Sequence, residues 1–163
     1  MLATHSDFRE VTFHNRNLTR EAALAIRDSG GVIGFNLCLP FLGGTHIEAL
    51  LPHLEYALET VGEDAICFGG DIDGIDAYPA GLSMEYSLHE QMLDFLRSRG
   101  YSEELLYKLA CGNMLRVLEA ITCKDIFDAG KAGDAVALQI LDKYYSLLGE
   151  FLANLCCVVN PEA

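Results

Sequence analysis

Apolar residues follow two different periods along the chain, and the pattern changes after residue 84. In the first part, short continuous apolar runs span residues 32–38 and 64–70. Such runs are typical of strands that are buried on both faces of a parallel sheet. Helical spacing of apolar residues precedes each run, over about 18–29 and 45–61. The order helix–strand–helix–strand predicts an α/β fold, with a loop from Pro40 to Gly44.

After residue 84 only helical spacing remains, so the second half is predicted to be all helix. Helices are expected at about 86–98, 102–120 and 133–157, with a short one near 124–130. The helix from 133 to 157 carries one apolar stripe, which we expect to pack on the 102–120 helix or on a second copy of the chain. The stripe consists of Ala137, Ile140, Leu141, Tyr144, Leu148, Phe151, Leu152 and Leu155.

Composition narrows the class of protein. Of the 163 residues, 51% are hydrophobic and 21% are charged, which predicts a globular chain with a buried core. The formal net charge of -13 argues against nucleic acid and anionic membranes as partners, because such a surface repels phosphate. No apolar run reaches the roughly 20 residues of a membrane-spanning helix, and no signal peptide is visible. The six cysteines form no CxxC pair, which favours free thiols and a cytoplasmic location.

Three local clusters could carry chemistry. The segment His5–Arg9 directly follows a possible strand end at Met1–Ala3, His14–Asn17 opens the first helix, and Gly69–Gly74 follows the second strand. Active sites of parallel sheets lie at the carboxyl ends of strands. An imidazole suits zinc, a guanidinium binds a carboxylate bidentately, and a carboxylate can hold an amine or move a proton.

Each cluster also has an ordinary structural interpretation. His5 could be a solvated side chain, Arg16 could simply be exposed, and Asp71 could cap a helix from a turn. The Gly69–Gly74 segment resembles a fragment of a calcium loop, but the EF-hand pattern fails because it lacks the required glutamate.

Five motifs in order resemble the membrane (renal) dipeptidase family of metallopeptidases over about residues 2–120. They are HSDFR, HNRN, GGVIGFN, CFGGDIDG and GNMLRVLEA. The resemblance implies a (β/α)8 barrel with two zinc ions that cleaves dipeptides. It implies that His5 is a zinc ligand, that Arg16 binds the substrate carboxylate, and that Asp71 faces the substrate amine and the scissile bond. Two departures are modest: Ile72 stands where an aromatic is frequent, and Phe8 replaces a small residue.

The larger departure is the missing N-terminal half of the family, with its other metal ligands. A full barrel needs roughly 200 or more residues. We therefore expect residues 1–120 to form an incomplete, C-terminal part of a (β/α)8 TIM-like barrel. Its two predicted strands make a poor sheet that needs a partner or a second copy. We expect little or no dipeptidase activity from the isolated chain. The alternative is a non-catalytic fragment or a helical interaction and oligomerisation module.

Residues 121–163 are predicted to form a separate helical tail. From residue 122 this tail resembles the penultimate helical segment of ROK-family sugar kinases, on the segments Lys131–Asp134, Leu152–Leu155 and Asn160–Glu162. The alternative is an amphipathic helix built from common residues. None of that family's phosphate loop, catalytic aspartate motif or zinc-binding cysteine cluster is present in the sequence. A homo-oligomer through this tail is a further expectation.

Overall fold

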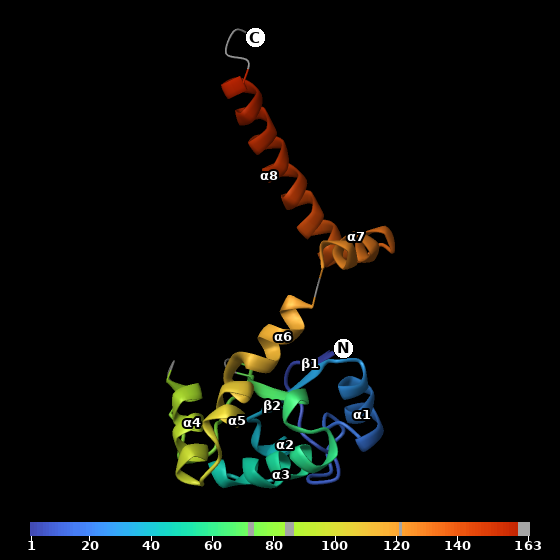
Figure 1. Cartoon of the computed structure of the whole chain (residues 1–163). Coiled ribbons are helices and arrows are strands. Elements are labelled where there is room, and N and C mark those ends of the chain that lie inside the picture. The colour runs from blue at the N-terminus through green and yellow to red at the C-terminus, as the bar shows by residue number, and fades with distance from the viewer. Residues whose placement is uncertain (72–73, 84–86, 121, 160–163) are drawn as a thin grey trace. The chain divides into compact units, whose positions relative to one another are not determined.

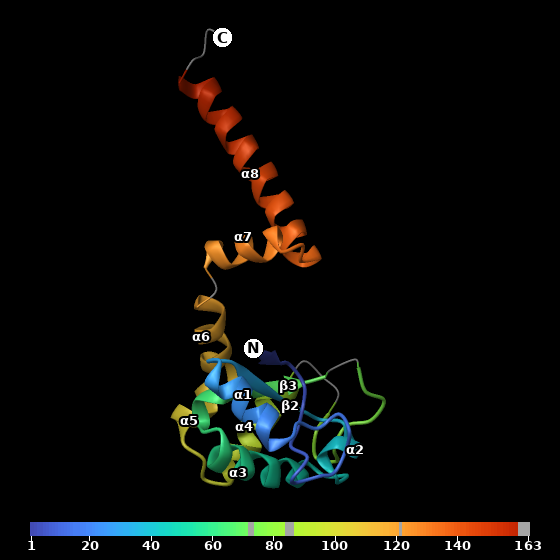
Figure 2. The ribbon, with the colours of Figure 1, turned by 90° about the vertical axis from the view of Figure 1, so that its right-hand side faces the viewer.

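The computed structural model describes residues 1–71, 74–83, 87–120 and 122–159, with side chains described except at 123 and 151–159. The chain divides into two compact units, Met1–Leu118 and Glu119–Ala163. The first unit contains all strands that the structure describes and the second is helical. Figures 1 and 2 show α1, α3, α4 and α5 arranged around the strands of the first unit.

A parallel three-stranded sheet lies at the centre of the first unit, in the order β1-β2-β3. The strands are β1 (Leu2–Ala3), β2 (Val32–Asn36) and β3 (Ile66–Gly70). Every residue of β2 is buried, which explains its continuous apolar run. β2 and β3 confirm the two predicted strands. β1 lies at the possible strand end suggested at Met1–Ala3, so the sheet has one strand more than the two that were counted.

Helices cover the sheet where the spacing predicted them, with two differences. Thr19 caps α1 (Arg20–Asp28), and a 3-10 turn at Ile47–Ala49 leads into α3 (Leu50–Thr60). A second 3-10 turn, Glu63–Ala65, precedes β3, and α4 spans Leu88–Ser98. The segment predicted as a loop contains the short helix α2 (Leu39–Leu42). Pro40 is tolerated in its first turn, where no backbone donor is needed, and Gly43 ends it at a φ of 73°.

The helix predicted over 102–120 is interrupted. Its parts are α5 (Glu103–Tyr107), a π-helical segment (Lys108–Gly112) and α6 (Asn113–Glu119). A π turn pairs residue i with i+5 and so changes the spacing, but over five residues the change is too short for periodicity to reveal it.

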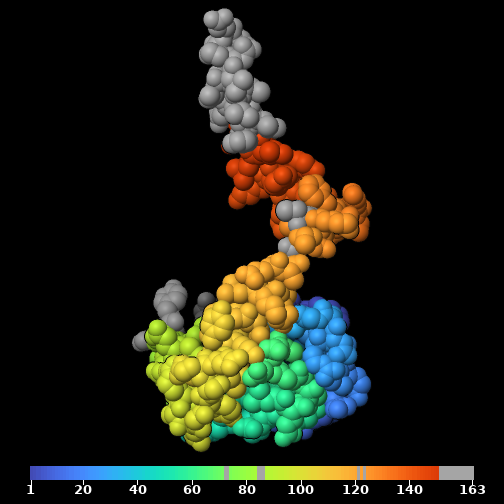
Figure 3. Space-filling model, in the orientation of Figure 1, coloured from blue at the N-terminus to red at the C-terminus, as the bar shows by residue number. Residues whose placement is uncertain are grey.

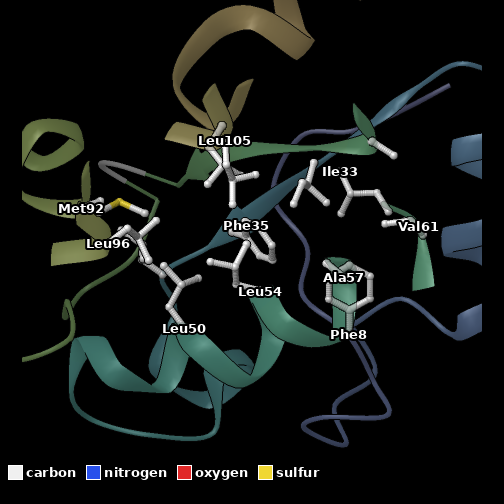
Figure 4. Packing of buried hydrophobic residues seen from close by; sticks show 14 of the residues in the cluster. Phe8, Ile33, Phe35, Leu50, Leu54, Ala57, Val61, Met92, Leu96 and Leu105 are labelled. Carbon is white, nitrogen blue, oxygen red and sulfur yellow. The ribbon is translucent and has the colours of Figure 1, made fainter. Parts of the chain in front are cut away.

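The core lies between the sheet and α3, and α4 closes one side of it. Figure 4 shows Leu54 and Ala57 of α3 directed toward Ile33 and Phe35 of β2. Phe8, which follows β1, is fully buried in the same cluster. Burying a side chain of this size contributes about 1.5–3 kcal/mol. Other members include Ile26, Leu37, Leu42, Leu50, Val61, Ile66, Leu88, Met92, Leu96, Leu105, Leu106 and Leu109.

Two polar side chains of α6 tie this helix to the N-terminal ends of the strands. Nδ2 of the buried Asn113 donates to the carbonyls of Glu63 (2.7 Å) and Ile66 (2.8 Å). The guanidinium of Arg116 donates to the carbonyls of Gly30 (2.9 Å) and Asp64 (2.8 Å). The GNMLR motif is therefore structural, because it satisfies backbone carbonyls at the end of the sheet opposite to His5 and Asp71.

The second unit is a pair of helices. A capping box formed by Thr122 and Asp125 opens α7 (Cys123–Lys131), and α8 spans Ala135–Val159. α7 packs against the first part of α8 (Figure 3). At this contact Phe127 lies against the rings of Tyr144 and Tyr145. α8 confirms that the predicted 133–157 helix is continuous. In the part of the chain that the structure describes, no helix has the length and apolar character needed to cross a membrane.

Candidate active site

Three parallel strands deliver polar groups to the same end of the sheet. His5 follows β1, Asn36 ends β2, and Asp71 follows β3. Nδ2 of Asn36 lies 3.2 Å from Oδ2 of Asp71 and 3.5 Å from the carbonyl oxygen of His5. Because the strands are parallel, their carboxyl ends lie at the same end of the sheet, and this brings His5 and Asp71 to a common neighbour.

Arg16 and Thr4 fix the protonation pattern of the His5 ring. Nη2 of Arg16 lies 3.0 Å from Nε2 of His5, and Oγ1 of Thr4 lies 2.8 Å from Nδ1. A guanidinium can only donate, so Nε2 must accept. Nδ1 therefore carries the proton and donates to Thr4. This is the neutral tautomer whose Nε2 lone pair can bind a metal.

A buried asparagine holds the loop that carries Arg16. Nδ2 of Asn17 donates to the carbonyls of Thr12 (2.9 Å) and Phe41 (2.8 Å). The backbone N–H of Arg16 donates to Nδ1 of His14 at 3.2 Å. The backbone of Arg16 is therefore held in place, while its side chain is exposed and its guanidinium lies beside His5. Such a cation can bind a carboxylate from solution.

Asp71 has an uncommon backbone conformation. Its φ is 56°, in the left-handed region, which aspartate tolerates better than most residues. Its N–H donates to the carbonyl of Gly69 (2.8 Å), and its carbonyl accepts from the N–H of Gly74 (3.0 Å). A Cβ at position 74 would lie 2.2 Å from Oδ1 of Asp71, so any larger residue there would displace this carboxylate. Ile72 and Asp73 of the same motif lie outside the described residues.

A buried carboxyl supports the end of β2. Asp7 is fully buried, and its Oδ1 accepts from the backbone N–H of Asn36 at 3.1 Å. Burial raises the pKa of Asp7 to about 7, and the hydrogen bond from Asn36 opposes part of this rise. Among the described atoms, Oδ2 of Asp7 has no hydrogen-bond partner.

Asn36 and Asp7 received no role from the sequence. Asn36 could have been noticed because it is a polar residue at the end of an otherwise apolar strand. The signal for Asp7 was its place within the HSDFR motif.

His5 fits zinc as one ligand, and the other described residues do not complete a set. Zinc usually takes three or four protein ligands. No group of three or more His, Cys, Asp or Glu side chains within the described ranges is arranged to hold a metal. Among the described residues, Nε2 of His5 is therefore one suitable zinc ligand, and a zinc site would need further ligands besides it.

Comparison with known protein families identifies the family to which this chain belongs. The family model of membrane dipeptidases (peptidase family M19) matches residues 1–125. The chain belongs to the membrane dipeptidase family. Its parallel strands and helices match part of the M19 dipeptidase structures.

Two solved structures illustrate the match. One is a dipeptidase described as an M19 metallopeptidase, with 33% identity and a TM-score of 0.66; the match covers 72% of this chain and 36% of the dipeptidase. The other is a metallopeptidase from Rhodobacter sphaeroides that holds a phosphinate mimic of the dipeptide L-Ala-D-Ala. It also has 33% identity and a TM-score of 0.66, with 72% of this chain and 35% of that chain covered.

Curated relatives match the chain over part of their own length. An uncharacterized protein in the pqqA 5' region of Klebsiella pneumoniae is 36% identical over 128 residues, covering 74% of this chain and 46% of that protein. Human dipeptidase 3 is 26% identical over 124 residues, covering 74% of this chain and 25% of that protein. The chain thus spans less than half the length of these relatives. The comparisons provide no evidence for the kinase resemblance of residues 122–163, which stays a prediction.

Proposed function

We propose that this chain carries one side of a zinc-dependent dipeptidase site, within an incomplete C-terminal part of a (β/α)8 barrel. The observation that carries the proposal is the 3.0 Å contact between Nη2 of Arg16 and Nε2 of His5, at the sheet end where Asp71 also lies. Family membership over residues 1–125 and the dipeptide mimic held by the Rhodobacter relative support the same reaction class.

In the proposed reaction Arg16, Asp71 and His5 have different roles. Arg16, exposed and positively charged, binds the carboxylate of the dipeptide. Asp71 faces the amine and the scissile bond, where a carboxylate can hold the ammonium group and move a proton. His5 offers its Nε2 lone pair as one zinc ligand. The chemistry that zinc contributes in such a site is Lewis-acid polarisation of the scissile carbonyl.

Two further features of the chain belong to this proposal. The free thiols of Cys38, Cys67 and Cys111 accord with a reducing compartment such as the cytoplasm. The proposal needs zinc ligands in addition to His5, because the described residues contain no group of three or more candidate ligands that could hold a metal.

Zinc titration of the full chain tests the proposal. We expect calorimetry to detect zinc binding that is lost in His5→Ala and kept in His46→Ala, an exposed histidine outside the site. With zinc present, a phosphinate mimic of L-Ala-D-Ala should bind more weakly to Arg16→Ala than to the wild type. Equal zinc binding by His5→Ala and the wild type would contradict the assigned ligand.

The isolated chain should show little or no turnover of a dipeptide, even with added zinc, because one histidine cannot hold a two-metal centre. Turnover with a kcat of roughly 1–10³ s⁻¹ that His5→Ala abolishes would contradict this expectation.

A second candidate function rests on the helical unit. Several large apolar side chains of α8 are exposed, among them Val136 (65%) and Leu147 (57%). Exposed apolar side chains gathered on one helix favour a contact with another protein surface. We propose a second copy of this chain as that partner.

A further inference from the structure

We infer that Asn36 is a positioning residue for Asp71: its side-chain amide holds Oδ2 of Asp71 and thereby fixes the rotation of the carboxylate. This inference rests on the proposed function, because it concerns how the proposed proton-transfer group is aimed. Nothing in the sequence motifs or in the comparisons assigns this role to Asn36.

The orientation of the Asn36 amide follows from its neighbours. The backbone N–H of Cys38 lies 2.6 Å from one end of the amide and can only donate, so that end is the acceptor Oδ1. The opposite end is therefore the donor Nδ2. It lies 3.2 Å from Oδ2 of Asp71 and faces the carbonyl oxygen of His5 at 3.5 Å. Both of these neighbours are hydrogen-bond acceptors, which agrees with the assignment of this end as the donor Nδ2.

The backbone of Asn36, like its side chain, is fixed by hydrogen bonds. The register between β2 and β3 shifts between Phe35 and Asn36, which opposes Gly70. The N–H of Asn36 donates to Oδ1 of Asp7 at 3.1 Å, and the residue is fully buried. A bulge of this kind redirects a side chain at the end of a strand. Here it aims the amide at the turn that carries Asp71.

The consequence for Asp71 concerns its two oxygens. An amide N–H group donates but cannot accept, so Oδ2 must remain an acceptor while this contact persists. A proton that Asp71 takes up in the reaction is therefore directed to Oδ1. Asn36 thus fixes the rotation of the carboxylate.

A double-mutant cycle on the full chain tests this pairing. Asn36→Asp places a second acceptor and a second negative charge against Asp71, and should lower the melting temperature by about 5–10 °C. Asp71→Asn restores a donor–acceptor pair and should recover at least half of that loss in the Asn36→Asp background. Asn17→Asp is the matched control: Asn17 is also buried and its amide donates to two carbonyls, so Asp71→Asn should not rescue it. Equal effects of Asp71→Asn in all backgrounds would overturn the inference.

A second measurement covers the case in which Asn36→Asp does not fold. In the 15N spectrum of the wild type, the side-chain amide signals of Asn36 should shift when Asp71 is replaced by alanine, while those of Asn17 stay in place. Unchanged Asn36 signals would overturn the inference. Neither measurement uses zinc or a dipeptide. A failed zinc titration with intact coupling rejects the proposed function, whereas absent coupling with zinc bound rejects the positioning role.

Discussion

Nη2 of Arg16 and Nε2 of His5 lie 3.0 Å apart, so the residue proposed to bind substrate holds the lone pair that zinc needs. In the proposed site the two roles would therefore be linked. A substrate carboxylate bound by Arg16 would free Nε2 of His5, which would then be one ligand for zinc. Thr4 contacts the opposite nitrogen, since its Oγ1 lies 2.8 Å from Nδ1 of His5.

Arg16→Met should raise the affinity of the chain for zinc by roughly twofold to tenfold, the range expected for the loss of one competing hydrogen bond. Isothermal titration with zinc chloride measures this change. Arg20→Met is the matched control, since Arg20 is an equally exposed arginine at the start of α1. Unchanged or weaker zinc binding by Arg16→Met would show that the guanidinium does not compete for His5.

Much of the fold was predictable from the sequence because periodicity reports burial directly. The strands β2 and β3 have continuous apolar runs, and α3 and α4 have a clear helical period. The short helix α2 was missed because Pro40 and Gly43 are typical of loops, although both are allowed at the ends of helices. The π-helical segment was missed because it spans only five residues, too few for its different spacing to show in the apolar pattern.

The candidate site was predictable in part. The motifs predicted roles for His5, Arg16 and Asp71, which stay predictions, and the strand ends gave a reason for His5 and Asp71 to lie at the same end of the sheet. Asn36 and Asp7 were missed because their hydrogen bonds join segments 29 and 35 residues apart in the chain, and such pairings are not visible in one sequence. The sequence thus singled out candidate residues by their chemistry, whereas the hydrogen bonds between them were visible only in the structure.

Burial of Asp7 should make the chain less stable as the pH rises. The pKa of this carboxyl is about 7 in the folded chain, against an ordinary value of 3.8. Between these values the folded state keeps a proton that the unfolded state has lost, so stability falls with rising pH by up to about 4 kcal/mol. Asp7→Asn should remove this fall. Urea unfolding of both proteins at pH 5 and pH 8 measures the difference.

Two comparisons isolate the effect of Asp7. Asp28→Asn, at an exposed carboxyl, should keep the wild-type pH dependence. His53 acts in the opposite sense: burial lowers its pKa to about 4, so its contribution is lost as the pH falls from 6.5 toward 4. The pH 5 to pH 8 difference must therefore be compared between variants. A wild-type pH dependence in Asp7→Asn would contradict the prediction.

Asn113→Ala should destabilise the first unit by about 2–4 kcal/mol. The change removes the donor that serves the carbonyls of Glu63 and Ile66, and a buried carbonyl without a partner costs about 1–3 kcal/mol. Chemical denaturation followed by circular dichroism measures the loss. Asn15→Ala, at an exposed asparagine, should change stability by less than about 0.5 kcal/mol. Equal stabilities of the two variants would mean that Asn113 does not tie α6 to the sheet.

Leu148→Asp should unfold the helical unit or dissociate an oligomer that forms through α8. α7 contacts α8 through Tyr144 and Tyr145, and beyond these residues Leu147 and Leu148 are 57% and 37% exposed. A second copy of the helix would cover this surface, and a carboxylate within it would lack a partner. Ser146→Asp is the control, because the Ser146 side chain bonds only the carbonyl of Asp142 among the described contacts. Gel filtration with light scattering gives the mass of each variant, and a thermal melt gives its stability. If Leu148→Asp keeps the mass and melting temperature of the wild type while Ser146→Asp does the same, the apolar stripe is neither a core nor an interface, and the helical unit has another role.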